Sequence, residues 1–211
     1  PDLVEILTYS KKLFPNLQRI SIYGSSQYII KKGLEDMKKI AKAGLSRIHV
    51  GLETGDDILL EKTKKGTTQK EQIQAGQIVK KSGIELSEYV VLGLGGTVRS
   101  TEHIQNTIIA LNAINPTFIR IRTLLPKINT PLLDDIQKGK FELLSPHQVL
   151  HELYNLIQGL SVTSHLTSDH YTNYLPINGK FPNDKKKMLK EIEEALKREE
   201  NSFRKTYIGT E

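Results

Sequence analysis

The chain has 211 residues, 37% of them hydrophobic, and a formal net charge of +6, which predicts one well-packed domain with a small appendage and excludes disorder throughout. It contains no cysteine, which excludes disulfides and any metal site or iron–sulfur cluster held by its own thiolates. No stretch reaches the roughly twenty apolar residues of a membrane helix, and no signal peptide opens the chain, so we expect a cytoplasmic protein with no membrane partner.

The first eighty residues alternate between predicted helices and strands. Two capping boxes mark helix starts, one formed by Asp2 with Glu5 and one by Thr68 with Glu71. Glycine and proline mark the ends of these helices, because glycine accepts the left-handed conformation and proline cannot continue a helix. The predicted elements are a helix that ends at 15–16, a strand over 17–23, a helix over 34–43, a strand over 46–53 and a helix that closes at Gly83.

The alternation continues over the next forty residues. A strand over 89–94 leads into a glycine turn at 93–96 and then a helix, which ends at 115–116 before a strand over 117–125. Strand starts therefore recur at roughly the thirty-to-forty-residue spacing of βα units, which predicts a parallel sheet in an α/β fold. Four such units are too few for a complete eight-stranded barrel, which takes about 250 residues, so the sheet is open or strands are missing.

The pattern changes after Pro131. Ser145 and Pro146 begin a helix with one apolar stripe, a short strand follows at 162–167, and an amphipathic helix occupies the tail over 184–204. We therefore divide the chain into a first domain over 1–132 and a mostly helical appendage over 133–211. Basic and acidic residues are interleaved in the tail, and no aromatic residues accompany the basic ones, so nucleic-acid binding is not favoured.

The segment S-R-I-H-V-G-L-E-T-G-D-D at 46–57 ends a predicted strand in a carboxylate, Glu53. Gly51 and Gly55 permit close backbone approach on either side of it. Ligands collect at the carboxyl ends of parallel strands, which favours a ligand site. The alternative is a strand followed by a turn whose acidic residues cap the next helix.

Two further features lie on later strands. The turn V-V-L-G-L-G-G-T brings bare backbone at Gly93 and Gly95 to the start of a helix, which suits either a phosphate or nucleotide contact or an ordinary tight connection. Arg120 and Arg122 share one face of their strand, where they would meet Glu53 or a substrate carboxylate, or lie on a solvated edge.

The segment S-D-H-Y-T-N is a dense polar cluster near the carboxyl end of the chain. Its Asp169, His170 and Asn173 are candidate substrate contacts. The cluster has no spaced second pair of histidines, so it does not define a metal site. We assign no metal ligand in this chain and no catalytic residue.

Taken in order and spacing, the chain resembles the later half of a radical S-adenosylmethionine (SAM) enzyme. The segments that carry the resemblance are R-I-H-V-G-L-E-T-G-D-D, K-K-G-T-T, V-V-L-G-L-G-G-T and I-R-T-L-L-P-K-I-N-T-P-L, over roughly 17–132. They are most similar to the branch that includes the Elongator catalytic subunit, methylthiotransferases and oxygen-independent coproporphyrinogen oxidase.

The resemblance implies a partial parallel TIM-like barrel, the later βα units of the radical SAM horseshoe, followed by the helical appendage. It implies SAM and a 4Fe–4S cluster as cofactors, with reductive cleavage of SAM to a 5′-deoxyadenosyl radical. Glu53 would contact the ribose or methionine end of SAM, the backbone at Leu92 and Gly93 would pack on adenine, and Arg122 would face the interior. The implied cofactor-binding set is Gly51, Glu53, Leu92, Gly93, Gly95 and Arg122, with Arg120, Asp169, His170 and Asn173 facing an unknown substrate.

Two departures accompany the resemblance. Gly-Gly-Thr at 95–97 replaces the common Gly-Glu-Thr, and Asn-Thr-Pro at 129–131 replaces Gly-Thr-Pro. The family's three-cysteine cluster motif would precede Pro1. We therefore expect a carboxyl-terminal piece of an oxidoreductase or transferase that receives electrons from a donor, and we expect this piece alone to be inactive.

Two other functions fit parts of the pattern. A phosphate-binding barrel isomerase or aldolase would use 93–96 as its phosphate grip, and a non-catalytic module would bind RNA through its net positive charge. We also expect an unpaired sheet edge that favours a homodimer.

Overall fold

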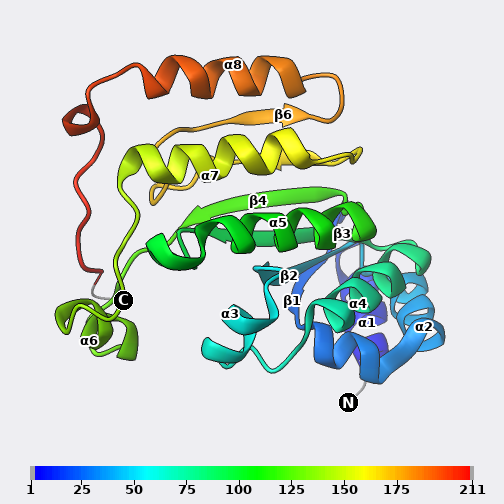
Figure 1. The fold of residues 1–211 in the computed structure, drawn as a ribbon. Helices are drawn as coiled ribbons and strands as arrows, with labels where there is room; N and C mark the ends of the chain where they lie inside the picture. Colours follow the sequence, from blue (N-terminus) through cyan, green and yellow to red (C-terminus); the bar gives the residue numbers. More distant parts are fainter. Residues whose placement is uncertain (1–2, 210–211) are drawn as a thin grey trace.

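The computed structural model describes residues 3–209, which form an α/β fold around one six-stranded sheet (Figure 1). The strands follow one another in chain order across the sheet; the first five are parallel and the sixth is antiparallel. This confirms the predicted parallel α/β fold. The strands are β1 (Ser21–Gly24), β2 (Arg47–Glu53), β3 (Glu85–Leu92), β4 (Phe118–Thr123), β5 (His165–Thr167) and β6 (Asn178–Lys180).

Eight α-helices and one short 3₁₀ helix connect and cover these strands in the described part of the chain. They are α1 (Leu3–Leu13), α2 (Ser26–Ala43), α3 (Asp57–Lys62), α4 (Gln69–Lys81), α5 (Gly96–Ile114), α6 (Pro131–Gln137), α7 (Pro146–Gly159), α8 (Lys185–Leu196) and η1 (Glu200–Ser202). The predicted capping box at Thr68 is present. Ser145, predicted to begin a helix, also forms a capping box. The capping role predicted for Asp2 lies outside the described residues.

Several boundaries differ from the predictions. α2 begins at Ser26 rather than near 34, because the chain continues as helix on both sides of a kink at Gly33, whose φ is 70°. β1 starts at Ser21, later than the predicted 17, and β3 runs over Glu85–Leu92 rather than the predicted 89–94. The short helices α3 and α6 were not predicted, since each is too brief to show a helical period.

The helices cover one face of the sheet and leave the other more open. Along β4 the burial alternates strictly, with Ile119 and Ile121 fully buried against the helices. The intervening residues, Arg120 and Arg122, point to the opposite side. We call this opposite side the open face; it carries His49, Gly51 and Glu53 of β2, Ser87, Tyr89 and Val91 of β3, and Phe118, Arg120 and Arg122 of β4.

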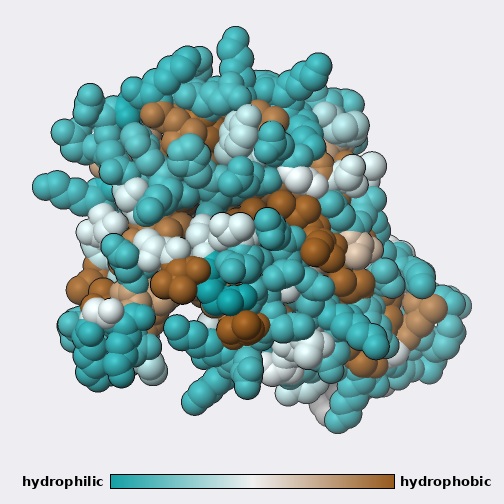
Figure 2. Space-filling view, in the orientation of Figure 1, coloured by the Kyte–Doolittle hydropathy of each residue, from teal (hydrophilic) through white to brown (hydrophobic). Residues whose placement is uncertain are grey.

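The carboxyl-terminal segments extend the same sheet and core. β5 pairs with β4, α7 packs on α5 and β3, and α8 packs on α7. α8 buries Met188, Ile192 and Ala195, and its outer side is hydrophilic (Figure 2), so the predicted amphipathic tail helix is confirmed. The division at residue 132 stays a prediction, although both the sheet and the hydrophobic core cross it.

β1 lies at one edge of the sheet and pairs only with β2 among the described strands. Self-association through this edge stays a prediction. Within residues 3–209, no helix has both the length and the apolar character to cross a membrane.

A substitution in α7 tests whether the carboxyl-terminal helices share the core. Leu156 is fully buried, so we expect Leu156→Ala to lower the free energy of unfolding by about 2–5 kcal/mol. Ile109 lies on α5 with 54% of its surface exposed, and Ile109→Ala should lower the free energy of unfolding by less than about 1 kcal/mol. Urea denaturation followed by circular dichroism measures both; equal losses would contradict a shared core.

Candidate functional site

A β-bulge at the end of β2 sets the position of Glu53. Gly51 pairs with Tyr89 and Glu53 with Val90, so Leu52 is an extra residue on β2. Glu53 adopts a φ of 62°, a left-handed conformation that costs a non-glycine residue about 1–2 kcal/mol. Its carboxylate folds over Gly51, where a side chain would collide with it, and lies 3.3 Å from Lys65 Nζ. The bulge thus turns Glu53 toward the open face.

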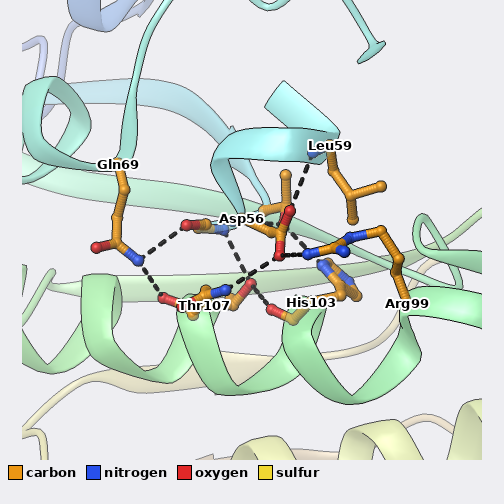
Figure 3. A network of polar contacts seen from close by, with 9 residues as sticks. Asp56, Leu59, Gln69, Arg99, His103 and Thr107 are labelled. Carbon is orange, nitrogen blue, oxygen red and sulfur yellow. Dashed lines mark hydrogen bonds and ion pairs between the residues drawn. The ribbon is translucent and has the colours of Figure 1, made fainter. Parts of the chain in front are cut away.

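The next residues attach this turn to α5 (Figure 3). Asp56 is buried; its Oδ1 accepts the Leu59 N–H at 3.0 Å and caps α3. Its Oδ2 accepts from Arg99 Nη2 at 2.8 Å and Asn106 Nδ2 at 3.0 Å. Burial raises the pKa of Asp56, but the hydrogen bonds from Arg99, Leu59 and Asn106 outweigh it and leave that pKa below its usual value.

A second chain of hydrogen bonds runs through His103 of α5. Its Nε2 lies 3.1 Å from the Val91 carbonyl, which can only accept, so Nε2 carries the proton. Nδ1 then accepts from the Thr54 hydroxyl at 2.8 Å, and Thr54 Oγ1 accepts the Asp56 N–H at 3.0 Å. Burial lowers the pKa of His103 to about 4, so the ring is neutral at pH 7. These bonds hold the turn in place and leave His103 no free nitrogen for catalysis.

Gly55 completes this attachment. Its N–H donates to Thr107 Oγ1 at 3.0 Å, and its carbonyl accepts from Gln69 Nε2 at 2.8 Å. A side chain at Gly55 would collide with the Asn106 carbonyl of α5. The two interpretations of the segment at 46–57, a ligand site and a helix cap, each describe part of it. Asp56 caps α3, whereas Glu53 faces the open face.

The helix-covered side of the bulge contains a buried carboxyl group. The Leu52 carbonyl accepts from Gln72 Nε2 at 2.8 Å, and the Leu52 N–H bonds the carboxyl of Glu88. Burial, reinforced by the charge of Glu53, raises the pKa of Glu88 to about 8, so Glu88 is mostly protonated at pH 7. Gln72 and the Thr54 N–H thus satisfy the Leu52 carbonyl at the bulge, and Glu88 lies against the Leu52 N–H.

Three aromatic rings lie side by side on the open face. The Tyr23 and His49 ring centroids are 5.2 Å apart, and those of His49 and Tyr89 are 6.0 Å apart. Arg122 Cζ lies 4.9 Å from the centroid of the Tyr89 ring. The Tyr23 and Tyr89 centroids are 6.4 Å apart, so the three rings form a triangular cluster. The register brings them together, since Tyr23 pairs with His49, Gly51 with Tyr89 and Tyr89 with Arg120.

The open face is electropositive. Burial lowers the pKa of His49, and the charges of Arg120, Arg47 and Arg19 lower it further. Burial and then Arg122 lower the pKa of His170, against the opposing charge of Asp169.

The glycine turn after β3 is closed by its own chain. The Gly93 N–H donates to Glu152 Oε2 of α7 at 2.6 Å, and the Thr97 N–H donates to the Glu142 carbonyl at 3.2 Å. The Gly96 N–H bonds the Gly93 carbonyl at 3.0 Å. These three amides are unavailable to a phosphate, which counts against the phosphate-barrel alternative.

The predicted cofactor residues of this turn offer apolar rather than polar contacts. The Leu92 side chain is buried and its carbonyl accepts the Leu124 N–H at 2.8 Å. Gly93 adopts a φ of 81°, and Gly95 precedes α5. Packing of adenine on Leu92 and Gly93 stays a prediction.

The loop between β5 and β6 carries the predicted polar cluster to the end of β4. Asn173 Nδ2 donates to the Ile121 carbonyl at 3.0 Å, and its Oδ1 accepts from Thr123 Oγ1 at 3.1 Å. Asn173 therefore fastens the loop, while His170 lies near Arg122 and Asp169 is exposed. Within residues 3–209, no three His, Asp or Glu side chains gather as a metal site.

The structure brings Glu53, Gly51, Arg120, Arg122 and the His170 loop to one side of the sheet. The sequence prediction missed four members of this site: Tyr23, His49, Lys65 and Tyr89. His49 alternates with Gly51 on one strand and Tyr89 with Val91 on the next, so a period-two analysis of the polar and aromatic residues would have placed both on this side.

Comparisons with known proteins agree with the resemblance. The sequence profile described as the radical SAM superfamily matches residues 1–108. The heme chaperone HemW of Bacillus subtilis (strain 168) is 29% identical over 125 residues, which are 58% of this chain and 32% of that protein. The chain thus spans about a third of the length of this relative.

Two solved structures share the fold. Elp3 of the archaeon Methanocaldococcus infernus, with its N-terminus deleted, matches with a TM-score of 0.60 and 17% identity, over 85% of this chain and 42% of that one. The methylornithine synthase PylB matches with a TM-score of 0.50 and 18% identity, over 91% of this chain and 61% of that one.

Removing the Asp56 side chain should loosen the turn. Asp56→Ala leaves the buried donors of Leu59 and Asn106 unpaired, and we expect a loss of about 1–3 kcal/mol in the free energy of unfolding. Asp56→Asn keeps an acceptor for Leu59 and should lose less. Urea denaturation measures both variants against Glu35→Ala, an exposed control; a loss no larger than that of the control would refute the role of Asp56.

Glu88 should make stability depend on pH. Its folded pKa of about 8 exceeds the ordinary 4.5, so the folded state binds the extra proton between these values. The free energy of unfolding should therefore fall as pH rises from about 5 to about 8, and level off above.

Glu88→Gln should reduce this fall by about 3–5 kcal/mol, the equivalent of the shift. In that variant Glu152, with a pKa raised to about 7, still lowers stability as pH rises, whereas the lowered pKa of His103 opposes it below about pH 6.5. Urea denaturation at several pH values, with Glu61→Gln as the exposed control, measures the difference. An unchanged slope in Glu88→Gln would contradict the assignment.

Proposed function

The chain belongs to the radical SAM superfamily, and we propose that it supplies part of the SAM pocket and the substrate face of an enzyme whose cluster ligands lie outside these 211 residues. Proteins of this family use SAM and a 4Fe–4S cluster. The chain itself has no cysteine, so its residues do not fit the cluster. Its share of the enzyme is therefore to bind and orient SAM and substrate.

The residues present do fit SAM. Glu53 is a carboxylate at the carboxyl end of a parallel strand, held in a strained left-handed conformation. Its oxygens can accept hydrogen bonds from two ribose hydroxyls or from an ammonium group. This placement of Glu53 is the observation that carries the proposal.

Neighbouring groups support this role for Glu53. The Thr54–Asp56 turn fixes the backbone through α5, and the ion pair with Lys65 orients the carboxylate. A half-buried ion pair of this kind contributes little to stability, so Lys65 can exchange partners when a ligand arrives.

Bound SAM would supply a 5′-deoxyadenosyl radical after one-electron reductive cleavage, and the protein would orient it. The electron would come from a donor protein. The open face beside Glu53 would then present the substrate to the radical, with Arg120 and the His170 loop as contacts. Arg122, predicted in the cofactor-binding set, lies on the same face as Arg120 and would contact the substrate as well. The reaction is that of an oxidoreductase or a transferase.

The experiment uses the longer protein, extended upstream to include the cluster motif, after anaerobic iron–sulfur reconstitution. We expect Glu53→Gln to weaken SAM binding and slow 5′-deoxyadenosine formation by about tenfold or more, the effect of losing charge-assisted hydrogen bonds. The control, Glu61→Gln on exposed α3, should change neither. Absence of an upstream cysteine motif, or normal SAM binding in Glu53→Gln, would refute the proposal.

A further inference from the structure

We propose that the open face at His49, Tyr89, Arg120 and Arg122 binds a small molecule that combines a flat ring with a carboxylate. The inference deepens the proposed function, on which it rests for the ligand's identity as substrate. The binding itself follows from the surface of this chain and needs neither SAM nor a cluster.

The ring part of the ligand is inferred from the aromatic cluster of Tyr23, His49 and Tyr89. The Tyr23 and Tyr89 rings are nearly parallel, with 22° between their planes and 6.4 Å between centroids. The Tyr23 side chain is 78% exposed, so its face is available for stacking. A flat ring laid on this cluster would gain contact area, and the guanidinium of Arg122 would border it.

The carboxylate is inferred from two guanidinium groups without acidic partners. Within residues 3–209, neither Arg120 nor Arg122 forms an ion pair, whereas Arg47 pairs with Glu85 and Lys65 with Glu53. Two residues apart on one strand, Arg120 and Arg122 lie roughly 6.6 Å apart along β4, so both can reach one carboxylate. Guanidinium groups bind carboxylates through paired hydrogen bonds, which carbonyl or hydroxyl groups cannot match.

Three polar atoms beside these arginines have no hydrogen-bond partner among the described residues. They are His49 Nδ1, Ser87 Oγ and Arg120 Nε. Each is buried, and Ser87 is fully buried. Buried polar atoms are nearly always paired in folded proteins, so these three atoms on neighbouring strands leave hydrogen-bonding capacity unused beneath this part of the open face.

The first measurement compares three probes by isothermal titration calorimetry on the 211-residue chain. Naphthalene-2-carboxylate has both features, its carboxamide has only the ring, and cyclohexanecarboxylate has only the anion. We expect the naphthalene carboxylate to bind about tenfold or more tightly than either. Equal affinity for the carboxylate and the carboxamide would overturn the proposal.

Substitutions locate the site. Arg120→Gln should weaken binding of the naphthalene carboxylate by about tenfold while leaving binding of the carboxamide unchanged. Arg122→Gln should weaken the carboxylate by about tenfold and the carboxamide by less, since Arg122 also borders the ring, whereas Arg198→Gln should change neither probe. Circular dichroism checks that each variant folds. If an arginine variant does not fold, the affinity of Tyr89→Ala for the naphthalene carboxylate is compared with that of Tyr89→Phe, since only Tyr89→Ala removes the ring. Normal carboxylate binding in all folded variants would overturn the proposal.

An NMR titration of His49, identified with His49→Gln, gives an independent readout. A bound anion offsets the nearby arginine charges, so the naphthalene carboxylate should raise the pKa of His49, while the imidazole resonances of His151, on α7, should not move. No change in the His49 titration at saturating probe would place binding elsewhere and overturn the proposal.

SAM is a second source of a carboxylate, and the same variants distinguish it. If SAM displaces the naphthalene carboxylate, and Arg120→Gln weakens the binding of SAM and of the naphthalene carboxylate equally, the site holds the carboxylate of SAM. The assignment of this site to the substrate is then overturned. If the probe and SAM bind together, the substrate assignment is supported. Probe binding in a protein that never binds SAM would refute the proposed function and leave this site standing.

Discussion

The fixed end of β2 is the constraint on which the candidate site depends. One extra residue, Leu52, turns the chain, and two hydrogen-bond chains through Asp56 and His103 attach the following turn to α5. A left-handed Glu53 is unfavourable on its own, so it persists because the residues on both sides are held. The protein thus places one carboxylate at the edge of the open face by burying most of the polar groups around it.

The fold was largely predictable because its signals are local. Capping at Thr68 and Ser145, and helix-ending residues at Gly44 and Asn115, are recorded in short stretches of sequence. The continuation of the sheet through β5 was harder to foresee, since three residues show no period and their pairing with β4 depends on a distant segment. The kinked start of α2 was missed for a related reason, because Gly33 interrupts the pattern without ending the helix.

The site was predictable only in part. Glu53, Arg120 and Arg122 could be assigned to one side by alternation and strand ends. The bulge could not, because it depends on how β2 pairs with β3, and neither could the roles of Gln72 and Glu88, which lie on other elements and meet at Leu52. Whether an acidic residue caps, pairs, stays protonated or faces a ligand is decided by tertiary neighbours.

Glu152 joins the last part of the chain to the turn after β3, since its carboxyl accepts the Gly93 N–H and the Ser100 hydroxyl, both at 2.6 Å. These bonds limit which segments could replace the carboxyl-terminal part of the chain. Any replacement for α7 would have to bring its own acceptor to Gly93. Recombination in this protein should therefore preserve α7 and vary the loops beyond it.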